Sequence, residues 1–116
     1  MGRLAHLSPG RLGAAHVFVA DVDGRAIGWA EILPPEGGVY VLEHLWVRPP
    51  SMRRGAGSRL FRHAAGAARD LGATSMEWEA EPHALGFYAR MGGEPLRTAT
   101  SEWGRELQIM GVALAR

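Results

Sequence analysis

The chain of 116 residues contains no cysteine, no lysine and no long apolar run. Without cysteine there is no disulfide, no thiolate metal site and no cysteine nucleophile. Without lysine there is no phosphate-binding loop of the kind that ends in Gly-Lys-Ser or Gly-Lys-Thr. No apolar stretch approaches the roughly 18 residues that a membrane-spanning helix needs. The opening MGRLAHLSPGRLG lacks the apolar core of a signal peptide, so we expect a cytoplasmic protein that does not bind membranes.

The sequence also lacks a strong charge of either sign, since its formal net charge is +1. Apolar residues make up 47% of the chain and charged residues 22%, as in an ordinary globular protein, and the length predicts one domain over residues 1–116. A small cluster of arginines surrounds Gly55, which raises the alternative of a nucleic-acid-binding helix. Because these arginines gather at one end of the predicted helix and no aromatic platform accompanies them, we expect no nucleic-acid partner.

Apolar periodicity predicts a mixed α/β fold with a largely antiparallel sheet, in the order ββ-β-α-β-α-β-β. The pair Asp23-Gly24 is typical of a hairpin turn, and Gly72 ends the long helix. The helix should cross over between one parallel pair of strands, 39–47 and 74–81. The predicted elements are a hairpin over 16–33, a loop over 34–38, strands at 39–47, 74–81, 94–100 and 106–114, a helix over 55–71 and a shorter helix after Pro82.

Two glycines, Gly55 and Gly57, open the long helix, which suggests a backbone that closely approaches a phosphate. A dinucleotide-binding fingerprint requires a third glycine where this chain has Leu60, and it requires a tight turn directly after the strand. Gly55 instead follows Val47 by eight positions. The remaining interpretation is a loop whose successive N–H groups, together with the helix N-terminus, hold a pyrophosphate.

The stretch WVRPPSMRRGAGSRLF resembles the acyl-CoA-binding motif of the GNAT superfamily of N-acetyltransferases, with Met52 to Gly57 in the six motif positions. Downstream, EPHALGFYARMGG is similar to a later motif of the same family, with Ala84, Phe87-Tyr88 and Gly92 in register. The two motifs occur in the family's order, and the resemblance runs from about His16 to the C-terminus. It implies a protein that transfers an acetyl group from acetyl-CoA, as cosubstrate and without a metal, to a small-molecule or peptidic amine.

The resemblance also implies roles for individual residues. Leu45 and Val47 would pair through their main chain with the pantetheine arm, Tyr88 would protonate the departing thiolate, and Glu43 would be the general base. The backbone N–H groups that would hold the CoA pyrophosphate belong to Arg53, Arg54, Gly55, Ala56, Gly57 and Ser58.

The chain departs from the family pattern at its N-terminus, where the family's first strand and first two helices are expected to be absent. Those helices form the wall of the acceptor site. Two hypotheses follow, an active enzyme and a shortened acyl-CoA-binding protein with little or no activity. A homodimer, in which a neighbouring subunit supplies the missing wall, would reconcile them.

The residues themselves leave several roles open. Acetyl transfer to an amine requires a proton acceptor for the amine and a proton donor for the thiolate. Glu43 suits the first role but is equally a solvated strand residue, and Tyr88 suits the second but is also a plausible core residue. The glutamates at 77, 79 and 81 either attract a cationic amine or form a polar strand face. His44 is predicted to be structural.

Overall fold

The computed structural model describes residues 3–7, 15–49 and 55–114. Within these ranges seven strands form one sheet in the order β1-β2-β3-β4-β5-β7-β6, in which only β4 and β5 run parallel. The mixed, mostly antiparallel α/β class predicted from the sequence is therefore confirmed. The elements are β1 (Arg3–Leu7), β2 (His16–Val22), β3 (Arg25–Glu36), β4 (Val39–Val47), α1 (Ala56–Asp70), β5 (Ser75–Ala80), η3 (Pro82–Ala84), α2 (Leu85–Arg90), β6 (Glu94–Thr100) and β7 (Glu106–Ala113).

The expectation that the first strand is absent is wrong. β1 pairs antiparallel with β2, from Arg3 opposite Asp21 to Leu7 opposite Val17. Its five residues, RLAHL, lie at the edge of the sheet and pair with β2 through the main chain. Such pairing does not require a strict alternation of side chains, so the sequence gives only a weak signal for this strand. In the described residues no helix precedes β2.

The loop predicted at residues 34–38 is also mostly strand. β3 continues to Glu36, and the turn into β4 consists of Gly37 and Gly38, whose φ angles of 61° and 83° suit glycine. The β3–β4 register shifts between Leu33 and Glu36. The two prolines, which cannot donate a ladder hydrogen bond, fall within that irregular segment, so β3 tolerates them.

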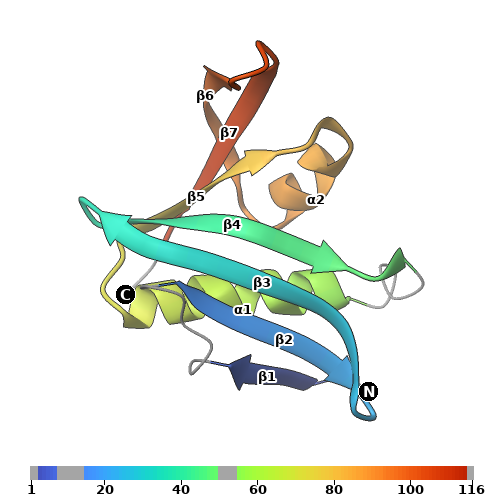
Figure 1. The fold of residues 1–116 in the computed structure, drawn as a ribbon. Coiled ribbons are helices and arrows are strands. Elements are labelled where there is room, and N and C mark those ends of the chain that lie inside the picture. Colours follow the sequence, from blue (N-terminus) through green and yellow to red (C-terminus); the bar gives the residue numbers. More distant parts are fainter. Residues whose placement is uncertain (1–2, 8–14, 50–54, 115–116) are drawn as a thin grey trace.

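The core lies between the sheet and α1, which runs along one face of β2, β3 and β4 (Figure 1). We call this the inner face of the sheet. Apolar residues at helical spacing on α1, including Leu60, Phe61 and Ala64, are buried against it. Met76 and Trp78 on β5 are buried too, as the alternation of that strand predicts. The spacing of apolar residues in the sequence would place Leu71 on the same buried face, but α1 ends at Asp70 and Leu71 is 49% exposed.

β4 and β5 pair only near their starts, and this positions the site. The parallel ladder joins residues 39–41 of β4 to residues 75–77 of β5 and then ends. Beyond it the two strands diverge, as Figure 1 shows, and α2 lies beside the diverging part of β5. The second half of β4 therefore has a main-chain edge that β5 does not cover.

Gly28 on β3 provides a test of the packing between β3, β4 and α1. A Cβ atom at this position would lie 2.7 Å from the Trp46 carbonyl oxygen and 3.0 Å from Leu60 Cδ1. We expect Gly28→Ala to lower the free energy of unfolding by about 1–3 kcal/mol, because a backbone atom cannot move aside cheaply. Urea denaturation would measure the change.

Gly66 in α1 is the matched control, since a Cβ there would meet nothing within 4 Å. Gly66→Ala should raise stability by roughly 0.5–1 kcal/mol, because alanine loses less conformational entropy in a helix. A Gly28→Ala protein as stable as wild type would contradict the close approach of β4 to Gly28.

Candidate active site

A cleft of about 650 Å³ opens where β4 and β5 separate. One wall is β4, and the other comprises the end of β5, η3 and α2, with the first turn of α1 at one end. The lining residues are Val41, Leu42, Glu43, His44, Leu45, Trp46, Val47, Gly57, Glu79, Glu81, His83, Ala84, Phe87, Tyr88 and Arg90.

Five of the sequence-predicted site residues therefore line one cavity. They come from three separate elements, and they are Glu43, Leu45, Val47, Gly57 and Tyr88. Gly55, Ala56 and Ser58 lie beside Gly57 at the start of α1. Arg53 and Arg54 lie outside the described residues.

Glu43 is the extra residue of a β-bulge. Leu42 pairs with Ile32 and His44 with Glu31, which leaves Glu43 without a partner on β3. Simple alternation along the strand would place Glu43 on the same face as Leu45 and Val47, and the structure shows that this expectation is wrong. The bulge shifts the alternation by one residue, so Glu43 is exposed at the cleft while Leu45 and Val47 stay on the inner face.

The start of α1 offers backbone donors near the cleft. Gly55 has a φ of 79°, a left-handed conformation that glycine adopts readily, and it turns the chain into the helix. Among the described residues no side chain caps this end. The N–H groups of Ala56, Gly57 and Ser58 have no carbonyl partner within the helix, so they can bind an anion.

Tyr88 on α2 is buried among aromatic rings and also lines the cleft. Its ring centroid lies 5.0 Å from that of Trp78 and 5.2 Å from that of Phe87. Burial raises the pKa of the Tyr88 phenol, and the negative charge of Glu81 raises it further. The phenol therefore keeps its proton at neutral pH. The Tyr88 ring packs in the core and also lines the cleft.

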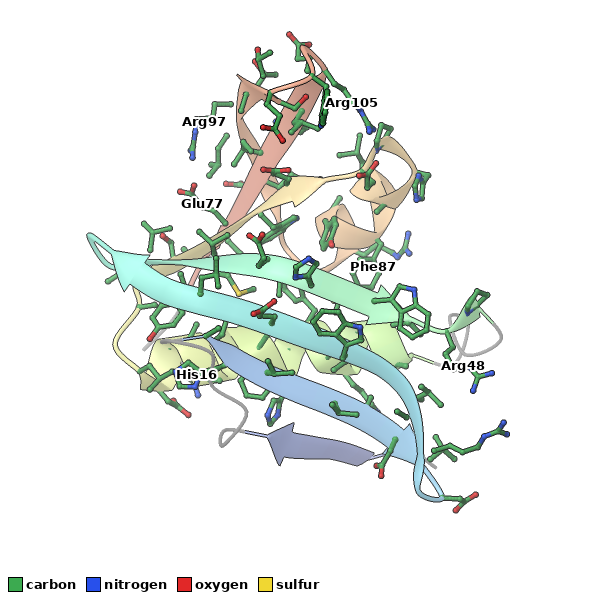
Figure 2. The ribbon with its side chains drawn as sticks, in the orientation of Figure 1. His16, Arg48, Glu77, Phe87, Arg97 and Arg105 are labelled. Atoms are coloured by element: carbon green, nitrogen blue, oxygen red, sulfur yellow. The ribbon has the colours of Figure 1, made fainter. Side chains whose placement is uncertain are left out.

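Phe87 was not predicted as a site residue, although it is adjacent to Tyr88 in the motif. Its ring approaches Gly57 so closely that a Cβ on the glycine would lie 3.4 Å from Phe87 Cε1 and Cζ. Figure 2 shows Phe87 on α2 at the side that faces β4. A Cβ at Gly57 would therefore be in van der Waals contact with the ring, and α1 and α2 lie close together at the cleft.

His44 and Trp46 were likewise not predicted to line the cleft. Both lie on the outer face of the sheet, opposite α1, and His44 Nδ1 is 2.9 Å from Glu31 Oε1. Alternation with Leu45 and Val47 accounts for their outward direction, whereas the contact of His44 with Glu31 depends on the pairing of β3 with β4 and leaves no signal in a single sequence.

The three glutamates of β5 and its end have different surroundings. Glu77 bonds to Arg97 at 2.7 Å and does not line the cleft. Figure 2 labels both side chains, which lie on the same side of the sheet end. Glu81 bonds to Arg105 at 3.0 Å and, like Glu79, lines the cleft. Two of the three therefore give the cavity wall acidic character.

The described part of the chain holds no group of three or more His, Asp or Glu side chains placed to bind a metal. Nor does it include a helix with the length and apolar character needed to cross a membrane.

The sequence matches the acetyltransferase (GNAT) family over residues 5–93, so the chain belongs to that family. The resemblance seen in the two motifs is thereby confirmed. The fold agrees: the structure superposes on a GNAT family acetyltransferase from Elizabethkingia anophelis with acetyl-CoA bound, with a TM-score of 0.86. That match covers 97% of this chain and 98% of the other at 9% identity.

Two curated relatives are mycothiol acetyltransferases. The one from Nocardia farcinica is 36% identical over 101 residues, which are 85% of this chain and 31% of the relative. The one from Actinosynnema mirum is 38% identical over 103 residues, which are 84% of this chain and 34% of the relative. The chain thus spans about a third of the length of the curated relatives it matches.

Proposed function

We propose that this chain is an acetyltransferase that moves the acetyl group of acetyl-CoA directly to a primary amine. The observation that carries the proposal is the cleft between β4 and β5. It brings together a strand edge that β5 does not cover, the N–H groups of a helix N-terminus and a buried, protonated phenol. Residues 1–116 act in this proposal as one acyl-CoA-binding domain.

The donor binds at the inner side of the cleft. Its pyrophosphate is held by the backbone N–H groups that run from Arg53 and Arg54 to Ser58, where the helix dipole favours negative charge. The pantetheine arm then lies along the free edge of β4 beside Leu45 and Val47, as an added strand would. This places the thioester near the middle of the cleft.

The acceptor approaches from the outer face, where Glu43 and His44 line the cleft. The amine nitrogen attacks the thioester carbonyl, the C–S bond breaks and a C–N bond forms. Tyr88 gives its proton to the leaving thiolate, since a phenol and an alkyl thiol have comparable acidity. Glu43, exposed on the bulge, accepts a proton from the amine nitrogen directly or through water.

A homodimer belongs to the same proposal. Trp46 and Val41 on β4 are 48% and 37% exposed. In the described residues α1 packs on the inner face, and the Phe87 and Tyr88 rings of α2 contact Phe61 of α1. Neither contact covers the outer face. A second copy of the chain over the outer face would complete the wall of the acceptor site. Light scattering that finds only a monomer would contradict the homodimer. The cytoplasmic location stays a prediction.

Calorimetric titration with acetyl-CoA tests the donor site, with NAD and ATP as controls. We expect micromolar binding of acetyl-CoA and none of NAD or ATP. A screen of amines that follows CoA release then tests transfer. Binding without transfer to any amine would favour the shortened acyl-CoA-binding protein, and no binding would overturn both. Because the chain has no lysine, any acetylated product is the added amine or the chain's own α-amino group.

A further inference from the structure

His44 is held in a defined orientation by two residues of the neighbouring strand. Its Nδ1 atom lies 2.9 Å from Glu31 Oε1, and its ring centroid lies 5.2 Å from that of Trp29. A carboxylate oxygen accepts hydrogen bonds, so Nδ1 carries the proton in this contact. The neutral ring then keeps Nε2 unprotonated, and Nε2 is the nitrogen that can accept a proton.

The Glu31 side of this pair is largely buried, and the His44 side is open to solvent. The Glu31 side chain is 19% exposed, whereas that of His44 is 52% exposed. His44 lines the cleft, immediately after the bulged Glu43. A histidine that served only to pack against Trp29 would not need a carboxylate on one ring nitrogen and an opening beside the ring.

The proposed reaction removes two protons from the amine nitrogen. An amine that arrives as an ammonium ion loses one proton before it can attack and a second when the amide forms. Tyr88 returns only one proton, to the thiolate, so the balanced reaction releases one to solvent. Glu43 alone would have to accept both protons in turn.

We propose that Nε2 of His44, oriented by Glu31, removes the first proton from the bound ammonium ion and passes it to solvent. The inference rests on the proposed function. In ordinary peptides an imidazole is a stronger base than a carboxylate by about two pH units, so it suits the first and harder deprotonation. Glu43 then accepts the second proton, from the more acidic nitrogen of the addition intermediate, and returns it through solvent to the Tyr88 phenolate, so that one proton is released in each turnover. In these roles His44 is catalytic and Glu31 is a positioning residue.

Other titratable or charged groups share the cleft with His44. They are Glu43 on β4, Glu79 and Glu81 at the end of β5, His83 on η3, and Tyr88 and Arg90 on α2. Because these groups can contribute to a pH profile of their own, the profile must be compared between variants.

The test is the pH dependence of kcat/KM with an amine that the screen has identified, for wild type, His44→Gln and Glu31→Gln. We expect His44→Gln to lower kcat/KM about tenfold to 100-fold at neutral pH and to remove the inflection there. Acetyl-CoA binding by calorimetry should not change. For Glu31→Gln we expect a smaller loss, and nitrogen chemical shifts should show that His44 no longer prefers the Nδ1–H tautomer.

Glu77→Gln is the matched control for Glu31→Gln. The Glu77 side chain is 20% exposed and pairs with Arg97, but it does not line the cleft. It should leave the pH profile unchanged. A His44→Gln enzyme with the rate and inflection of wild type would overturn the inference and leave the proposed function intact. A wild-type protein that acetylates no amine would overturn both.

Discussion

Gly57→Trp should weaken acetyl-CoA binding more than about 100-fold, which is a loss of roughly 3 kcal/mol. A Cβ at Gly57 would already lie 3.4 Å from the Phe87 ring and 3.7 Å from Val47 Cγ2. No room remains there for an indole except in the cleft itself. The indole would occupy the passage between the start of α1 and β4, which the proposed donor must follow. Calorimetric titration with acetyl-CoA measures the effect.

Gly66→Trp is the control, because it places the same side chain on the same helix where a Cβ meets nothing within 4 Å. That variant should bind acetyl-CoA as wild type does. Thermal unfolding of both variants separates a blocked cleft from a damaged fold. A Gly57→Trp protein that folds and still binds acetyl-CoA with wild-type affinity would place the donor elsewhere.

The sequence was sufficient for most of the elements, since their signals are local. The helix was predicted from apolar residues three and four positions apart, and the structure places it at Ala56–Asp70. The alternation of Met76, Trp78 and Ala80 gave β5 and its buried face. The parallel pairing of β4 with β5 followed from the helix that connects them.

Features that depend on a partner strand could not be predicted in this way. β1 is held by main-chain pairing with β2, which requires no particular side chains. The bulge at Glu43 arises from a mismatch between β3 and β4, and neither strand shows it alone. The divergence of β4 and β5, which creates the cleft, is likewise invisible in either sequence segment.

In the candidate site, too, residues in local motifs were predicted and residues that depend on a partner strand were not. Gly57 and Tyr88 were found because they belong to short motifs, and both line the cleft. His44 was assigned a structural role because an isolated histidine carries no spacing signal. Its pairing with Glu31, 13 positions away in the sequence, appears only when β3 and β4 lie side by side.

Tyr88→Phe should lower kcat about 100- to 1,000-fold, because the variant has no proton to give to the leaving thiolate. The pKa of the Tyr88 phenol is raised, first by burial and then by Glu81, so wild type should hold this proton well into alkaline pH. Acetyl-CoA binding should change little, since the ring itself and its contacts with Trp78 and Phe87 remain. The assay is CoA release at saturating concentrations of both substrates, with binding followed by calorimetry.

Tyr40→Phe provides the matched control. Tyr40 is also buried, with 5% of its surface exposed, but it lies on β4 outside the lining of the cleft. The same loss of a hydroxyl there should leave kcat unchanged. If Tyr88→Phe also kept the wild-type kcat, the thiolate would take its proton from another source and Tyr88 would serve the core alone. If kcat fell together with acetyl-CoA affinity, the hydroxyl would hold the donor rather than protonate its thiolate.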